Sequence, residues 1–136
     1  MNNQTFSPTN STPPRDFLPV LQKTKSVYIV WFEYYSNLPK THRYTLGQRI
    51  DSLFVEMIEA ISIATFLDKT EKLPWIRLAI RKLDTTKVLF LILWETKSLD
   101  TKKYIHISKP LEEIGRMLGG WNGQVAKSLE KQNSPK

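Results

Sequence analysis

The chain has 136 residues, a formal charge of +7 at pH 7 and no cysteine. This length predicts one domain with a single core, and the missing cysteine excludes disulfides, thiolate zinc sites and cysteine nucleophiles. Such a positive charge favours a polyanionic partner, although composition alone does not require one.

The two ends of the chain differ in composition from the rest. Residues 1–16 are rich in Asn, Ser, Thr and Pro and predict a disordered tail, and residues 131–136 predict a second, shorter one. The folded domain is therefore expected over residues 17–130. The N-terminus lacks the basic-then-apolar order of a signal peptide, and no apolar run approaches the roughly 20 residues of a membrane span, so we expect a cytoplasmic protein.

The first two predicted helices are marked by apolar periodicity and by their ends. Apolar residues recur at helical spacing over residues 18–38, and Pro39 then ends that helix. A second stripe follows over residues 46–67. Thr45 and Gln48 form a capping-box pattern, which predicts that the second helix begins there.

Two prolines mark the expected starts of the other helices. Pro74 fits the first turn of a third helix that runs toward Leu99, and its second half is apolar nearly all round. Ser108 is the expected N-cap of a fourth helix, with Pro110 in its first turn and an apolar stripe to Val125. Four such segments with short connections predict an all-α, antiparallel up-down-up-down four-helix bundle.

Four of the five glycines lie in the fourth segment. Gly115 and Gly119 are four residues apart and share a helix face, where a missing side chain allows a close approach. The alternative interpretation is that Gly119 and Gly120 cap the end of the helix. Because Trp121 and Val125 continue the apolar stripe, we favour a helix that runs on beneath a close contact.

Two motifs together resemble a known family. The stretches PKTHRYTLGQRI (residues 39–50) and EIGRMLGGW (residues 113–121) resemble the accessory variability determinant proteins of diversity-generating retroelements, and the likeness spans residues 18–121. The resemblance implies a basic four-helix bundle that forms a ring-like homopentamer and binds the retroelement's reverse transcriptase and its template RNA or DNA. It implies a non-enzymatic accessory of mutagenic reverse transcription. The motif positions expected to be structural or to lie at subunit interfaces are Tyr44, Gly47, Gly115, Gly119, Gly120 and Trp121.

Two other interpretations remain open at this point. A related four-helix family, encoded by intervening sequences of large ribosomal RNA genes, shares the architecture and part of the loop motif. The Gly-Gly-Trp sequence favours the retroelement family. The second alternative is a purely structural oligomer that binds no nucleic acid and uses its charge for solubility.

Residues suited to catalysis are few. His42 and His106 fall in predicted loops and lack the Glu-x-x-His partner of metal sites in helical bundles. Glu56 and Glu59 share a helix face but have no histidine beside them. Nucleotide-binding loops and serine-nucleophile motifs are also missing. We therefore expect no enzyme, no metal and no cofactor.

Basic residues are the candidate binding groups. In an up-down bundle the first and third connections meet at one end, which predicts a basic cluster there, and Arg77 and Arg81 lie one turn apart on the third helix. Ordinary solvation or local pairs such as Lys87 with Asp84 are the alternative, and the sequence does not separate RNA, DNA and polymerase as partners. The candidates are Lys40, Arg43, Arg49, Arg77, Arg81, Lys87, Lys102, Lys103 and Lys109.

Several motif and aromatic residues have more than one expected role. Arg43 either bonds carbonyls of a neighbouring subunit or contacts a ligand, and Tyr44 either covers the bundle end or contacts a ligand; we favour the structural role for both. Trp31 and Trp94 are expected in the core, and Trp75 and Trp121 in the core or at a subunit interface.

Overall fold

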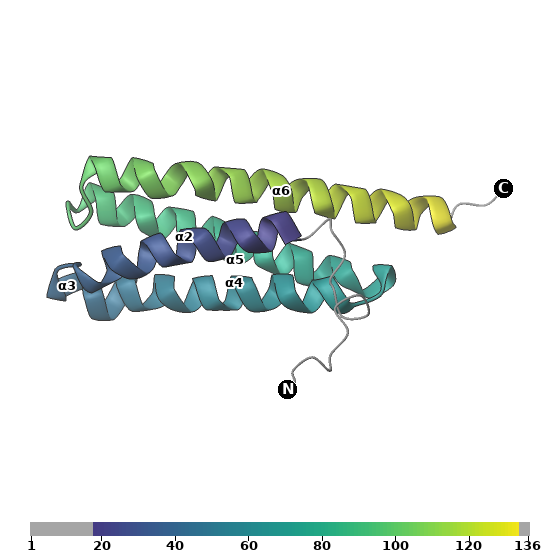
Figure 1. Ribbon diagram of the computed structural model, residues 1–136, viewed down its shortest axis with the longest axis horizontal. Helices are drawn as coiled ribbons and strands as arrows, with labels where there is room; N and C mark the ends of the chain where they lie inside the picture. Colours follow the sequence, from purple (N-terminus) through teal and green to yellow (C-terminus); the bar gives the residue numbers. More distant parts are fainter. Residues whose placement is uncertain (1–17, 134–136) are drawn as a thin grey trace, which may run out of the picture.

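The computed structural model describes residues 18–133, which form an all-helical bundle without strands in that range (Figure 1). This confirms the predicted four-helix fold. The expected N-terminal tail, residues 1–16, lies outside the described residues, as do residues 134–136. The elements are α2 (Leu18–Ser36), α3 (Lys40–His42), the π-helix η2 (Arg43–Gly47), α4 (Gln48–Phe66), α5 (Lys69–Glu95) and α6 (Thr101–Asn133).

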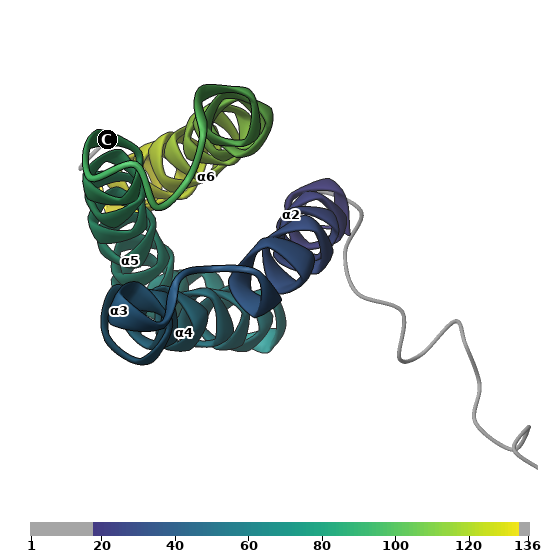
Figure 2. The same ribbon diagram turned by 90° about the vertical axis from the view of Figure 1, so that its left-hand side faces the viewer.

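The four long helices alternate in direction, as predicted. Viewed end on, they follow one another around the bundle in the order α2, α4, α5, α6, and α6 also packs against α2 (Figure 2). The first connection and the α5–α6 connection therefore lie at the same end of the molecule, which we call the loop end (Figure 1).

An aromatic cluster occupies the middle of the core. Trp31 of α2 is fully buried, stacks on Tyr35 with a centroid distance of 5.2 Å and meets Phe90 edge-on at 5.2 Å. Its indole Nε1 donates a hydrogen bond to Asp51 Oδ1 at 3.3 Å, and the Tyr28 hydroxyl donates to the same oxygen at 2.8 Å. The indole N–H and the phenol hydroxyl of this cluster thus have hydrogen-bond partners at the border of the core, as buried polar groups require.

The start of the second long helix differs from the prediction. The chain turns into α3 directly after Pro39 and passes through the π-helix η2 before α4 begins. Thr45 does not cap a helix, because its hydroxyl donates to the Thr41 carbonyl at 3.2 Å. The capping-box prediction is wrong because helical backbone already precedes Thr45 and satisfies the amides that a cap would bond.

The third long helix begins and ends earlier than expected. It starts at Lys69, so Pro74 lies in its second turn and not in its first. It ends at Glu95, where the Ser98 amide donates to the Leu93 carbonyl at 2.9 Å. Lys97 supports this helix end with a left-handed backbone, φ 67°. Together with the bond from the Lys97 amide to the Trp94 carbonyl at 3.0 Å, the Ser98 bond forms a Schellman motif, in which glycine is the usual left-handed residue.

The fourth long helix begins seven residues before the expected cap. Asp100 caps it, since its Oδ1 accepts a hydrogen bond from the Lys103 amide at 2.8 Å. Ser108 is not an N-cap; its hydroxyl donates to the Tyr104 carbonyl at 2.6 Å inside the helix. Pro110 is correspondingly interior. The helix continues to Asn133, three residues beyond the expected end of the folded domain.

The glycine segment remains helical, which confirms the prediction that the helix continues through it. Within the described chain, however, the expected close contact is missing at two positions. A Cβ added at Gly119 or Gly120 would meet nothing within 4 Å, whereas one at Gly115 would lie 3.4 Å from Leu83 Cδ2. Gly119 and Gly120 therefore expose helix backbone on the outer surface of α6.

Candidate functional site

The loop end joins the first connection to the start of α6. His42 Nδ1 lies 2.5 Å from Ser98 Oγ, so the side chains of α3 and of the α5–α6 connection are in contact. The lysines at the beginning of α6 and the basic residues of α3 and η2 thus share one end of the bundle. The structure places there Lys40, Arg43, Lys102, Lys103 and Lys109, five of the nine candidate basic residues.

Arg43 is used within its own chain. Its Nε and Nη2 donate to the Leu38 carbonyl at 3.2 and 2.9 Å. This carbonyl belongs to the turn after α2, which has left the regular helical bonding pattern. The guanidinium therefore stabilises the connection within its own chain.

Tyr44 and Gly47 have different roles in η2. Tyr44 is 64% exposed, and the Arg43 guanidinium lies 6.0 Å from its ring centroid. Tyr44 is therefore available to a partner and does not close the core. Gly47 is buried against α2, and a Cβ there would lie 2.9 Å from Leu38 Cδ1 and 3.0 Å from Tyr35 Cε1. Only a glycine lets the π-helix pack this closely.

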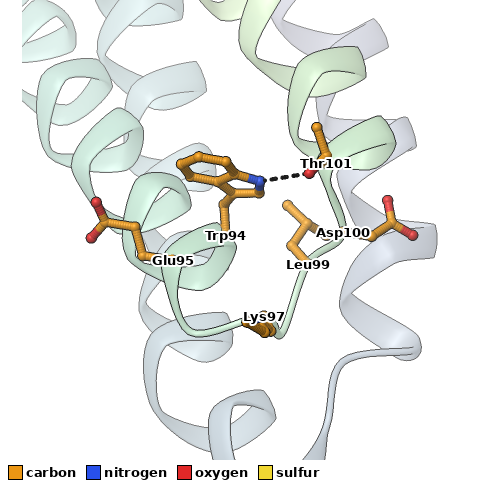
Figure 3. A pocket seen from close by; sticks show the side chains of 6 residues that line it. All are labelled: Trp94, Glu95, Lys97, Leu99, Asp100 and Thr101. Atoms are coloured by element: carbon orange, nitrogen blue, oxygen red, sulfur yellow. Dashed lines mark hydrogen bonds between the residues drawn. The ribbon is translucent and has the colours of Figure 1, made fainter.

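A hollow of about 560 Å³ opens beside the α5–α6 connection. Trp94 was expected in the core, and this expectation is wrong. Its side chain is 36% exposed, and its Nε1 donates to Thr101 Oγ1 at 3.0 Å (Figure 3). Its ring stacks on Tyr104 with centroids 5.2 Å apart. The error arises because the helix ends one residue after Trp94, where the bundle no longer surrounds the side chain.

The remaining candidate cations lie along the sides of the bundle. Lys87 pairs with Glu112 of α6 at 3.3 Å and not with Asp84, and Arg49 lies 3.7 Å from Glu56. Arg77 Nε donates to Asn122 Oδ1 at 3.2 Å. The carboxylates partly compensate the charges of Lys87 and Arg49, whereas Arg77 keeps its charge because Asn122 is neutral.

Arg81 and the loop-end lysines differ from Lys87 and Arg49 in their ion pairing. Among residues 18–133, no carboxylate lies within ion-pair distance of Arg81, Lys40, Lys102, Lys103 or Lys109. Their positive charges are therefore the most available to an external anion.

At the end of the bundle opposite the loop end, Lys72 stabilises the fold, and the sequence did not predict this role. Lys72 Nζ donates to the Ala64 carbonyl at 2.6 Å and to the Thr65 carbonyl at 3.2 Å, and so caps the end of α4. Burial lowers the pKa of Lys72. Its ammonium also lies 5.8 Å from the Trp121 ring centroid. Half-buried Trp121 thus packs at the far end of the core.

The carboxylates do not gather into a metal centre within the described chain. Glu56 binds Lys82 at 2.9 Å, and no group of three potential His, Asp or Glu ligands occurs in residues 18–133. In the same range no helix is long and apolar enough to cross a membrane.

Comparison with known proteins agrees with the two sequence motifs. The model of the bAvd-like family matches residues 18–125, which include both the loop motif and the glycine segment. This confirms the resemblance. The chain matches no curated protein and no solved structure.

Proposed function

The chain belongs to the bAvd-like family, and we propose that it is a non-enzymatic accessory protein of a diversity-generating retroelement. In this proposal its basic surfaces bind the reverse transcriptase and the template RNA and support mutagenic reverse transcription. The observation that carries the proposal is the family match across 18–125, almost the whole described bundle.

The distribution of charge supports a polyanionic partner. The chain carries +7, and the lysines of the loop end have no carboxylate partner among the described residues. Each such lysine that neutralises a phosphate releases a counterion and so favours binding. An acidic face of the polymerase is the second partner with matching charge.

Assembly strengthens this argument. We propose a homopentamer, the form that the family resemblance implies. Five copies of a +7 chain carry about +35, and linked weak phosphate contacts gain affinity through effective concentration. The exposed Tyr44 and the bare backbone at Gly119 are surfaces that a neighbouring copy could cover.

The test is RNA binding by the full chain, measured by fluorescence anisotropy at several salt concentrations with the oligomer mass recorded in the same buffers. We expect a log affinity that falls linearly with log salt. A pull-down with the retroelement's own reverse transcriptase tests the second partner. If the protein binds neither RNA nor the polymerase near physiological salt, the proposal is wrong.

Charge-reversal variants separate specific surfaces from net charge. Arg77, Arg81 and Lys87 changed together to Glu should lower binding and retroelement activity. The matched control changes Lys25, Lys127 and Lys131 to Glu, which makes the same change in net charge at positions outside this group. An equal loss in both triple variants would assign the effect to net charge alone. Unchanged activity of the first variant, with its oligomer intact, would favour the purely structural alternative.

A further inference from the structure

A second hollow at the loop end lies between α2 and α6. It measures about 570 Å³ and is lined by Tyr34, Asp100, Lys102, Lys103, Ile105, His106 and Lys109. Ile105 provides an apolar surface that is 46% exposed, and the half-buried Tyr34 forms the α2 side. The hollow therefore combines an apolar area, an aromatic ring and several cations.

The charges in this hollow are unbalanced. Lys102 and Lys109 have no carboxylate within ion-pair distance among residues 18–133, and Lys103 instead places its ammonium 5.5 Å from the Tyr34 ring centroid. The single acid, Asp100, already accepts the Lys103 amide as the helix cap. Three ammonium groups thus line a space that holds only one carboxylate.

The Tyr34–His106 pair adds a directed donor. The Tyr34 hydroxyl and His106 Nδ1 are 2.6 Å apart. Burial, with smaller contributions from Asp100 and Glu33, raises the pKa of Tyr34, so the hydroxyl keeps its proton and donates to Nδ1 in the His106 tautomer that is protonated at Nε2. No group among the described residues hydrogen-bonds to Nε2, which leaves this N–H for a ligand.

The helical spacing places these donors in a row. Lys102, His106 and Lys109 are at positions i, i+4 and i+7 of α6 and therefore share one face, with Ile105 beside them. An anion held by His106 would lie between the two lysines and next to the apolar surface. A phosphate with an attached base matches this arrangement, since bases stack or pack on aromatic and apolar groups.

We propose that this hollow is a nucleotide-binding site, with the phosphate held by Lys102, His106 and Lys109 and the base against Ile105 and Tyr34. The nucleotide is either free or one unit of a single strand, because both present the same chemistry. The inference rests on the proposed function only in the second case, where the strand is the retroelement's nucleic acid.

The test uses the full chain and four probes: adenosine monophosphate, ribose 5-phosphate, inorganic phosphate and a short single-stranded oligoadenylate. Binding is followed by amide NMR shifts and by calorimetry. We expect the monophosphate nucleotide to bind more tightly than either phosphate without a base. Substituting His106→Ala or Lys102→Ala should weaken its binding about tenfold, because each removes a bond to a charged group.

Two controls keep the test specific. Lys25→Ala removes the same charge from an exposed position of α2 outside the hollow and should leave binding unchanged. Tyr34→Phe keeps the ring but frees His106 Nδ1, and we expect a smaller reduction than with His106→Ala. Because Lys102 is exposed and makes no described ion pair, Lys102→Ala tests the site even if a Tyr34 or His106 variant unfolds.

The outcomes distinguish the sources and the two proposals. Matching reductions with nucleotide and oligoadenylate support a general nucleotide site, and a reduction with oligoadenylate alone supports a site for one unit of a strand. Equal binding of inorganic phosphate and nucleotide, or variants that bind both the nucleotide and oligoadenylate as tightly as wild type, overturns the inference. Template RNA bound equally by wild type and these variants would leave the proposed function intact, whereas nucleotide binding without RNA or polymerase binding would reject only the proposed function.

Discussion

Gly47 is the residue where sequence and packing are most tightly linked. Its missing side chain lets η2 lie against Leu38 and Tyr35 of the preceding segment, and a Cβ would approach the His42 carbonyl oxygen to 3.1 Å. Two of these neighbours are core or backbone atoms, so little can move without disturbing the connection. The glycine of the loop motif thus serves packing within one chain, and the structural role expected for Gly47 has a physical cause.

We predict that Gly47→Ala lowers the free energy of unfolding by about 1–3 kcal/mol, the usual range for overpacking. Urea denaturation measures this change. The control is Gly115→Ala, where the added methyl has an ordinary 3.4 Å neighbour and the better helix propensity of alanine adds up to about 1 kcal/mol. Equal stability of the Gly47 variant and the wild type would contradict the packing argument.

A second prediction at the residue scale concerns Tyr28. Burial, followed by the hydrogen bond to Asp51 and the charge of that carboxylate, raises the pKa of Tyr28 to about 12. The folded state therefore keeps this proton more strongly than the unfolded state, whose tyrosine ionises near pH 10. Stability from this group is complete below about pH 10 and is lost as the pH rises toward 12.

The measurement compares unfolding free energies of wild type and Tyr28→Phe at pH 9 and at pH 11. We expect the variant to be less stable at pH 9, because Asp51 loses a donor, but to lose less stability on going to pH 11. The two proteins are compared by their changes in unfolding free energy between pH 9 and pH 11. The raised pKa of Tyr34 adds the same pH dependence to both and therefore cancels. Parallel pH profiles would show that Tyr28 does not contribute this dependence.

At the scale of elements, sequence patterns located the helix bodies better than their ends. The apolar stripes of α2 and α4 follow from residue spacing, because one face of each must be buried. The start of α6 was missed because only Ser108 was expected as its N-cap, although Asp100 is also a residue type that caps helices. Spacing cannot rank them. The choice depends on where α5 ends, and that end uses Lys97 in a conformation usually marked by glycine or asparagine.

The candidate site was also predictable only in part. Up-down topology was enough to bring α3 and the start of α6 to one end, so the basic cluster could be expected. The hydrogen bonds of Arg43 and Lys72 to carbonyls of their own chain could not be predicted, because they depend on which carbonyls the helix ends leave unpaired. The Tyr34–His106 pair was not predicted either, since its members are 72 residues apart and join only when α6 packs on α2.

The corrected start of α6 gives a test at this scale. We predict that Asp100→Ala destabilises the protein by about 1 kcal/mol, the usual cost of losing an N-cap. The comparison variant is Ser108→Ala, which we expect to change stability by less, because the Ser108 hydroxyl bonds a carbonyl that the helix already uses. Thermal and urea unfolding measure both. A larger effect at Ser108 would place the helix start where the sequence pattern first indicated it.

At the scale of the whole molecule, charge and assembly are linked through the exposed glycines of α6. The open space beside Gly119 and Gly120 means that alanine there meets no atom of the described chain. Each substitution should then stabilise the separate bundle by up to about 1 kcal/mol through helix propensity. In an assembly whose subunits approach the bare backbone, the same methyl groups would separate the helices.

We therefore predict opposite effects of Gly119→Ala with Gly120→Ala on the subunit and on the oligomer. Sedimentation should give a lower mass, while unfolding measured at low protein concentration gives a more stable subunit. Gly115→Ala is the control, because Gly115 faces Leu83 of its own chain and its substitution should leave the mass unchanged.

RNA binding provides the second readout of this prediction. If phosphate binding adds up across the oligomer, the double variant should show a shallower salt dependence, with the slope for a single strand reduced by about 0.7 for each phosphate that is no longer neutralised. A stabilised protein with unchanged mass and unchanged slope would mean that the glycines carry no interface. A lower mass with an unchanged slope would place the whole nucleic-acid site within one subunit, where the free lysines of the loop end are the groups best placed to form it.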